Sequence, residues 1–201
     1  MTIKVFLDCE FTEFEQPKLI SIALVTENNE RSFYAELTNT YTINDCSEFV
    51  VSIVLPLLDA KPLTLPLTDY TNVYARMSFD ECRIHLMKWF ELLNDESCIF
   101  NDVPQFDFTL LSSLFVEQWP EQLSLYCETI CSSTADGEEL YEKSTIQLFK
   151  NGFREHHSLD DARVMSKAYH AMQVSGIKTA SQQYITSVGL KHLSNRKIQN
   201  N

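Results

Sequence analysis

The sequence lacks the long apolar segments of membrane and secreted proteins. Its longest apolar run, residues 49–58, contains Ser52 and Pro56 and is too short to span a bilayer. Asp8 and Glu10 interrupt the apolar N-terminus, which therefore does not resemble a signal peptide. We expect a soluble protein with no membrane partner and predict a cytoplasmic location.

Disulfide and zinc-site spacings are also missing among the 6 cysteines. Only Cys127 and Cys131 are close together, and neither has a further Cys or His at zinc spacing. We expect all six thiols to be reduced and mostly buried. The chain has no internal repeat or low-complexity block. Its 201 residues, 44% of them hydrophobic, instead indicate one domain with a full-sized core.

Basic residues are scarce in most of the chain. Residues 1–140 hold 7 Lys or Arg against 24 Asp or Glu, a formal net charge of −17, whereas residues 141–201 hold 9 against 4 and carry +5. An acidic body repels long polyanions, so nonspecific duplex binding is not expected. The tail, residues 173–201, has four Lys or Arg and no acid. We predict a basic tail, either a flexible arm or a helix docked on the body.

Hydrophobic periodicity predicts an α/β fold. Residues 3–10 alternate between apolar and polar positions, and residues 18–26 are apolar on both faces, as in a central strand. With residues 31–37 they predict three antiparallel strands in succession. Shorter strands are predicted at 98–101 and 123–127, and helices at 47–58, 78–94, 106–116, 138–150 and 158–172.

The first chemically informative stretch is the end of the first strand. Asp8 and Glu10 are two positions apart, so their side chains share a face and their Cα atoms lie roughly 6.6 Å apart. Carboxylates this close repel each other, and a divalent cation would compensate their charge. The simpler alternative is a solvated strand end.

The second stretch is residues 101–108. Asp107 falls in the first turn of a predicted helix, and Phe106 and Phe108 flank it as core anchors. Asp107 is either a ligand in an acidic site or a residue that complements the helix dipole. Asp102 is the competing carboxylate and has the simpler reading of a turn residue.

The third stretch is residues 156–163, where a helix begins. At 100° per residue, Asp161 lies about 60° from the apolar face of this helix and Asp160 about 160° from it. We therefore expect Asp161 to border the buried face and Asp160 to face solvent. His156 and His157 precede the helix on a loop, where an imidazole is free to move.

Taken in order, the three stretches resemble the motifs of the DEDDh 3′→5′ exonucleases, in the ribonuclease T and proofreading-exonuclease superfamily. The segment before Phe106 is similar to a ribonuclease-T-like exoribonuclease branch. The sequence departs from the pattern in two of the motifs: Ser158 replaces the more usual Ala in the third, and Phe11-Thr12-Glu13 replaces Thr-Thr-Gly in the first. The matching residues are Asp8 and Glu10 in the first motif, Phe106 and Asp107 in the second, and His156, Asp161 and Ala162 in the third.

The resemblance implies a ribonuclease-H-like fold, with a mixed central sheet flanked by helices. The resemblance covers about residues 3–170. We predict an exonuclease domain at residues 1–172 and expect the basic tail or helix, residues 173–201, to belong to the same domain. The implied activity is metal-dependent 3′→5′ hydrolysis of single-stranded nucleic acid, RNA favoured over DNA, with release of nucleoside 5′-monophosphates. Two Mg²⁺ or Mn²⁺ ions would be bound by Asp8, Glu10, Asp107 and Asp161, with His156 as general base.

The expected partners are 3′ ends of single-stranded RNA or DNA, and a homodimer is left open. Phe11, Phe14 and Phe106 are candidates for stacking on terminal bases, with Thr12 beside them, although core packing is the simpler role for Phe106. We expect the strand to enter between Phe11 and the basic C-terminal third. The alternatives are a short-oligonucleotide hydrolase, a nucleic-acid-binding module without turnover, and a protein-interaction domain with an incidental acidic pocket.

Overall fold

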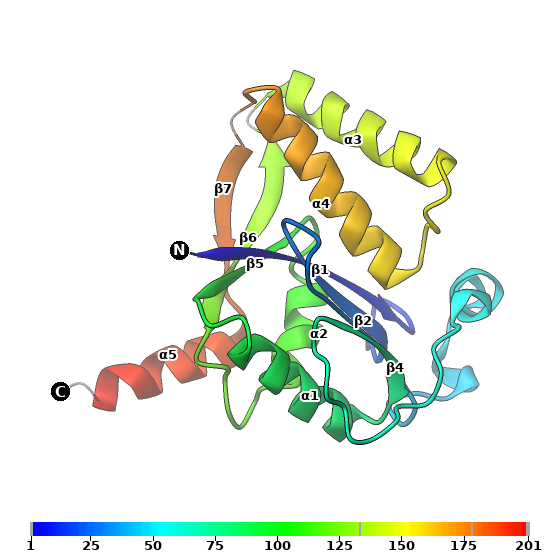
Figure 1. The fold of residues 1–201 in the computed structure, drawn as a ribbon, viewed down its shortest axis with the longest axis vertical. Coiled ribbons are helices and arrows are strands. Elements are labelled where there is room, and N and C mark those ends of the chain that lie inside the picture. The colour runs from blue at the N-terminus through cyan, green and yellow to red at the C-terminus, as the bar shows by residue number, and fades with distance from the viewer. Residues whose placement is uncertain (1, 133, 178, 200–201) are drawn as a thin grey trace.

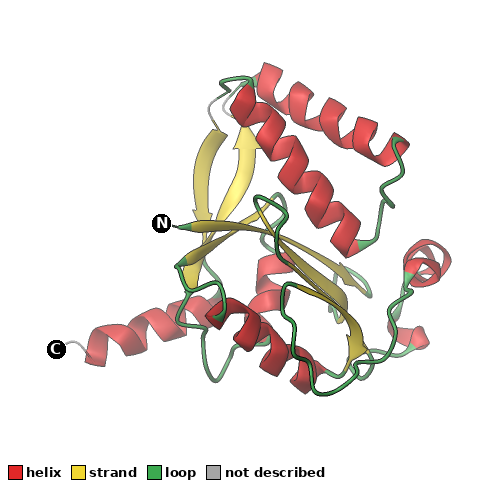
Figure 2. Cartoon of the chain, viewed as in Figure 1, coloured by secondary structure: helices red, strands yellow, loops and turns green. Residues whose placement is uncertain are grey.

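The chain forms a seven-stranded mixed sheet with helices on both faces (Figures 1 and 2). The structure, a computed structural model, describes residues 2–132, 134–177 and 179–199. The strand order is β4-β3-β2-β1-β5-β6-β7. The strands are β1 (Ile3–Phe11), β2 (Leu19–Thr26), β3 (Ser32–Leu37), β4 (Asn72–Met77), β5 (Ser97–Asn101), β6 (Leu123–Ser132) and β7 (Thr179–Tyr184). The helices are α1 (Phe79–Glu91), α2 (Asp107–Ser113), α3 (Ala135–Lys150), α4 (Ser158–Val174) and α5 (Ser187–Gln199).

The centre of the sheet confirms the predicted arrangement of the first three strands. β1, β2 and β3 pair in antiparallel succession, and every residue of β2 is buried. Asn29 turns the chain between β2 and β3 with φ of 57°, a left-handed conformation that Asn tolerates. β5 and β6 then continue the sheet in parallel with β1.

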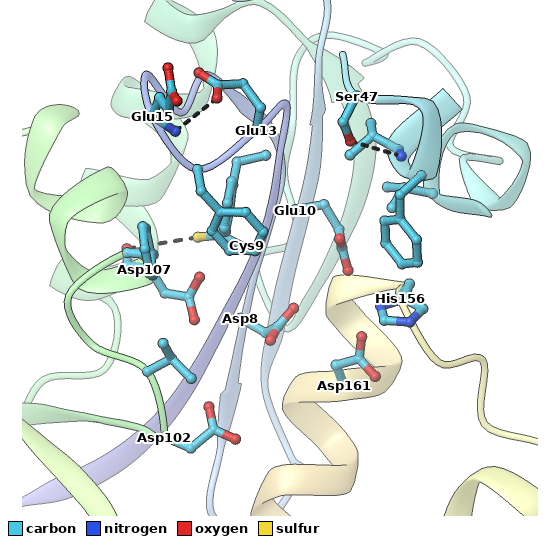
Figure 3. A pocket seen from close by; sticks show the side chains of 17 residues that line it. Asp8, Cys9, Glu10, Glu13, Glu15, Ser47, Asp102, Asp107, His156 and Asp161 are labelled. Atoms are coloured by element: carbon cyan, nitrogen blue, oxygen red, sulfur yellow. Dashed lines mark hydrogen bonds between the residues drawn. The ribbon is translucent and has the colours of Figure 1, made fainter. Parts of the chain in front are cut away.

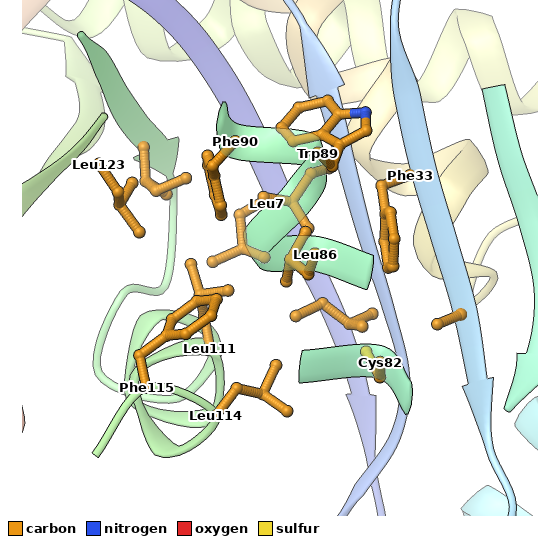
Figure 4. Packing of buried hydrophobic residues seen from close by; sticks show 14 of the residues in the cluster. Leu7, Phe33, Cys82, Leu86, Trp89, Phe90, Leu111, Leu114, Phe115 and Leu123 are labelled. Atoms are coloured by element: carbon orange, nitrogen blue, oxygen red, sulfur yellow. The ribbon is translucent and has the colours of Figure 1, made fainter. Parts of the chain in front are cut away.

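Side chains of β1 pack into both layers of the molecule. Leu7 points to the face covered by α1 and α2, where it joins Trp89, Phe90 and other buried residues (Figure 4). Phe6 points to the opposite face and packs against Tyr169 of α4, because successive side chains of a strand alternate. Asp8 and Glu10 share the parity of Phe6. They therefore lie on the face that α4 covers.

Both edge strands were missed in the sequence. β4 pairs in parallel with β3, and β7 pairs antiparallel with β6. β4 alternates exposed and buried positions, but it follows an irregular segment that gave no signal. β7 lies in the predicted basic tail and reads Thr-Ala-Ser-Gln-Gln-Tyr, without the apolar periodicity of a buried strand. These two strands are therefore defined by their pairing with β3 and with β6, and not by a pattern in their own residues.

The helix predicted at 47–58 is present as a continuous helical stretch at 48–57, although it is not a regular α-helix. A 3-10 turn at Ile43–Asp45 precedes it, a π-helical turn at Val50–Val54 forms its middle, and a 3-10 turn at Leu55–Leu57 ends it. Pro56 falls in the last of these, where it supplies no backbone N–H. No helix within the described ranges is long and apolar enough to cross a membrane.

Candidate active site

The end of β1 brings two carboxylates to the edge of an open groove. Asp8 and Glu10 are both partly buried there. Between them, Cys9 points to the opposite face, and its thiol contacts the backbone oxygen of Asp107 at 3.8 Å. The pairing of β1 with β2 shifts register between Glu10 and Phe11. This bulge ends the regular strand and redirects the chain.

The N-terminus of α4 supplies a third carboxylate. Oxygens of Asp8, Glu10 and Asp161 lie within 4.8 Å of one another, and Figure 3 shows the three side chains close together. Asp161 faces into the groove, as its helical phase predicted. Three carboxylates from strand and helix, up to 153 positions apart in the sequence (161 − 8), thus converge on one point.

Asp107 lines the same groove from the first turn of α2, on the other side of Asp8 (Figure 3). Its Oδ2 accepts a hydrogen bond of 2.7 Å from the side-chain amide of Asn101. The same amide also donates to the backbone oxygen of Leu7 at 2.7 Å. Asn101 therefore fixes the carboxylate of Asp107 relative to β1. Asp107 is not part of the close group formed by the other three acids.

Burial is the main cause of the raised pKa values in this acidic group. It raises the pKa of Glu10 to about 8, with further contributions from the charges of Asp161 and Asp107. The pKa of Asp8 is raised well above its usual range by burial and then by the charge of Asp107. Burial raises the pKa of Asp161 to about 8 and that of Asp107 to about 7. Without a compensating cation these acids therefore hold protons near neutral pH.

The two adjacent histidines have different surroundings. His156 lines the groove and has φ of 65°, a left-handed conformation that is uncommon outside glycine and is concentrated at functional sites. Its ring lies edge-on to Phe49 at 5.0 Å between centroids. His157 is buried and stacks on Tyr34 at 4.8 Å, where burial lowers its pKa.

The prediction that Asp160 faces solvent was wrong. Asp160 is 8% exposed, and its Oδ2 accepts hydrogen bonds from Nε of Arg154 at 2.7 Å and from the Arg154 backbone N–H at 3.2 Å. The prediction from helical phase assumed that α4 is covered on one face only and is exposed to solvent on the other. Here the preceding loop folds back over the first turn of α4, so that Asp160 and Leu159 are also covered.

The groove has a volume of about 910 Å³ and apolar walls. Phe11, Phe14 and Phe106 form one wall, with ring centroids 5.4–5.5 Å apart. Phe106 thus lines the groove, where its simpler expected role was core packing. Phe49 and Val50 belong to the opposite wall. The apolar walls stand on either side of the acidic group.

Thr12 does not line this groove. Its side chain is fully buried, and its hydroxyl accepts a hydrogen bond of 3.1 Å from the backbone N–H of Lys18. The basic tail is also distant. His192 of α5 contacts the backbone oxygen of Phe115 at 2.9 Å, just beyond the C-terminal end of α2, whereas the groove lies at its N-terminal end. The basic helix α5 therefore does not border the groove, and entry of a strand between Phe11 and the basic C-terminal third stays a prediction.

Three residues near the site were not identified in the sequence. Asn101 ends a buried strand, and its polarity at that position was the available signal. Phe49 was hidden in a segment without periodicity. Tyr141 of α3 lies beside the acidic group, where burial and the charge of Asp102 raise the pKa of its hydroxyl. Its place beside the acidic group depends on how α3 packs, which a sequence pattern does not reveal.

The donor set fits a divalent metal ion. Oδ1 of Asp161 is buried and has no hydrogen-bond partner among the described residues, although a buried polar atom ordinarily has one. It belongs to a close group of three carboxylates, the hard oxygen donors that Mg²⁺ and Mn²⁺ prefer. The acidic group can therefore bind a metal ion.

Two solved structures share this arrangement of strands and helices. A 3′-exonuclease that recognises the 3′ end of the histone mRNA stem-loop matches with a TM-score of 0.53 and 16% identity, over 92% of this chain and 90% of that one. The fold is ribonuclease-H-like. A full-length 3′-exonuclease matches with a TM-score of 0.53 and 14% identity, over 93% of this chain and 88% of that one. No protein-family model and no curated protein matches the sequence.

Proposed function

We propose that the protein is a metal-dependent 3′→5′ exonuclease that releases nucleoside 5′-monophosphates from single-stranded nucleic acid, with RNA preferred to DNA. The observation that carries the proposal is the group formed by Asp8, Glu10 and Asp161, whose oxygens lie within 4.8 Å of one another. His156 and the aromatic wall line the same groove. The similar folds of two 3′-exonucleases support the direction, and the histone mRNA stem-loop that one of them recognises supports RNA.

Asp8, Glu10, Asp107 and Asp161 are the residues that would hold two divalent cations. When bound, two such ions stabilise the charge that develops on the attacking and leaving oxygens of a phosphodiester. Asn101 orients Asp107 for this purpose through the 2.7 Å hydrogen bond described above. The full set of four acids argues against a binding module without turnover, because binding a polyanion gains nothing from converging carboxylates.

His156 is proposed to accept the proton of the attacking water. An imidazole has an unperturbed pKa near 6.5, which suits proton transfer near neutral pH. The water oxygen forms a bond to the phosphorus of the terminal phosphodiester, and the bond from phosphorus to the 3′-oxygen of the penultimate nucleotide breaks. The products are a nucleoside 5′-monophosphate and a strand with a new 3′-hydroxyl. Phe11, Phe14 and Phe106 would hold the terminal base by stacking.

The tail is proposed to be a structural part of the same domain. β7 extends the sheet by pairing with β6. The hydroxyl of Thr186, just before α5, donates to Ser112 of α2 at 3.1 Å. Both contacts join residues 173–201 to the body that carries the groove.

The deciding experiment uses 5′-labelled single-stranded RNA and DNA with Mg²⁺, Mn²⁺ or EDTA. We expect a ladder of shortened products in either metal and none in EDTA. The Asp8→Asn variant should be inactive, and a 3′-terminal phosphate should block the reaction. Cleavage of a circular single strand would show an endonuclease. If the protein binds the strands with or without metal and leaves them uncleaved, it is a binding module without turnover.

A further inference from the structure

The groove is lined by acids and apolar groups and has no lysine or arginine in its lining. Of the 17 residues that line it, seven are Asp or Glu, and His156 is the one that can carry a positive charge. Besides the four proposed metal ligands, the acids include Asp102, Glu13 and Glu15. Glu13 and Glu15 lie in the loop after β1, near the mouth of the groove (Figure 3).

The cations next to the groove are paired with acids. Lys18 Nζ contacts Asp45 Oδ1 at 2.6 Å. Arg154, two positions before His156, contacts Asp160 at 2.7 Å and Asp59 at 3.0 Å. Since α5 packs at the far end of α2, Lys191 is remote as well. The phosphates of a long strand therefore meet no lysine or arginine in the described lining of the groove, and Lys18 and Arg154 next to it already have acidic partners.

This lining limits how much of a strand can be bound. Proteins that bind along single-stranded nucleic acid combine base stacking with a positive groove that follows the backbone. Here stacking surfaces are present but the positive groove is missing. A volume of about 910 Å³ lies within the roughly 300–1,000 Å³ typical of small-molecule sites. Attraction is confined to the scissile phosphate and the bases between the two apolar walls.

We infer that the site recognises only the last two or so nucleotides at a 3′ end, so that very short oligonucleotides are substrates as good as long strands. The inference rests on the proposed exonuclease function and specifies its substrate class. Nucleotides beyond the second lie outside the stacking walls and meet Glu13 and Glu15, which repel their phosphates. Lengthening the strand therefore adds no binding energy.

The test is the dependence of kcat/KM on strand length and salt, from a dinucleotide to a strand of about 20 nucleotides, with Kd measured by fluorescence anisotropy in Ca²⁺. Across these strand lengths, kcat/KM and Kd should each stay constant within about threefold. When salt is varied, the slope of log kcat/KM against log salt should be shallower than about −1.4, the value for contacts to two phosphates at about −0.7 each. An increase of tenfold or more with length, or a slope as steep as several phosphates require, would overturn the inference.

Charge-reversal variants provide a second measurement. Glu15 is exposed at the groove mouth, whereas Glu117 is exposed beyond the C-terminal end of α2. Glu15→Lys should raise kcat/KM for the long strand relative to the dinucleotide and steepen the salt slope by about 0.7. Glu117→Lys should change neither. An unchanged length ratio in a folded Glu15→Lys protein would contradict the role given to the missing cations.

A nucleoside 5′-monophosphate p-nitrophenyl ester separates the two proposals. This substrate requires the hydrolytic centre but has no second nucleotide. If neither the ester nor any oligonucleotide is hydrolysed with Mg²⁺ or Mn²⁺, the proposed function fails. If the ester and long strands are hydrolysed but the dinucleotide is poor, the function stands and the inference is wrong.

Discussion

His156 and His157 are neighbours in the chain but have opposite surroundings. The ring of His156 lies edge-on to Phe49 in the acidic groove, 5.0 Å between centroids. The ring of His157 is buried against Tyr34, and its Nδ1 lies 3.4 Å from the guanidinium of Arg154. The left-handed backbone at His156 separates the two side chains. His156 thus lines the groove, whereas His157 is part of the buried structure.

Replacing the two histidines should give different phenotypes. His156→Ala should lower kcat by roughly 10²–10⁴-fold, the range for loss of a general base, with little change in KM. Its urea midpoint should match that of the wild type. His157→Ala should instead lower the urea midpoint, because it removes a buried ring. An active His156→Ala beside a folded but inactive His157→Ala would reverse the assignment.

The adjacent acids Asp160 and Asp161 should likewise differ. Asp161→Ala should abolish activity while leaving the metal-free protein as stable or more stable, since it removes a buried carboxyl group that folding forces to keep its proton. Asp160→Ala should destabilise the fold by about 1–3 kcal/mol, because Arg154 loses its buried partner, yet retain most activity where the protein is folded. Denaturant unfolding and activity on the same samples check both. Equal losses of activity in two folded variants would contradict the assignment of Asp161 as the ligand.

The metal-free protein should lose stability as pH rises. The pKa values of Glu10 and Asp161 are about 8 in the folded state, above the roughly 3.9–4.3 of unfolded chains. The folded state therefore binds more protons between about pH 4 and 8, and the free energy of unfolding falls across that window. In EDTA, the urea midpoint should be lower at about pH 8 than at about pH 6.

Metal ions and one substitution provide the controls for this pH dependence. Mg²⁺ or Mn²⁺ should remove most of the fall, because bound cations favour the charged carboxylates. Asp8→Asn should raise the urea midpoint in EDTA and flatten its pH dependence. A metal-free stability that rises between about pH 6 and 8 would show that the buried acids do not dominate the linkage.

Phe14 should contribute to substrate binding without contributing to stability. It is 73% exposed and packs edge-on against Phe11 and Phe106. Phe14→Ala should raise KM by about 5–150-fold, since stacking is worth about 1–3 kcal/mol per base, with an unchanged urea midpoint. Val174→Ala is the matched control, because Val174 is 74% exposed at the C-terminal end of α4. An unchanged KM in Phe14→Ala would remove Phe14 from the substrate site.

Local patterns in the sequence determined the centre of this fold. The alternation of β1 placed Asp8 and Glu10 on one face, because strand side chains repeat every two residues. The helix predicted at 78–94 corresponds to α1, and both hydrogen bonds of a capping box between Ser78 and Glu81 are present at its start. These features depend on neighbours within a few positions. They can therefore be predicted without knowing what packs above them.

Only the tertiary structure decided the edges of the sheet and the surroundings of the site. β7 exists because it pairs with β6, with Tyr184 opposite Cys127, and its own residues carry no apolar period. Asp160 is buried because a loop and Arg154 cover the first turn of α4, whereas helical phase alone placed it in solvent. Phe106 became a groove wall because Phe11 stacks on it. Each outcome depends on contacts between segments distant in sequence, and a local period contains no information about such contacts.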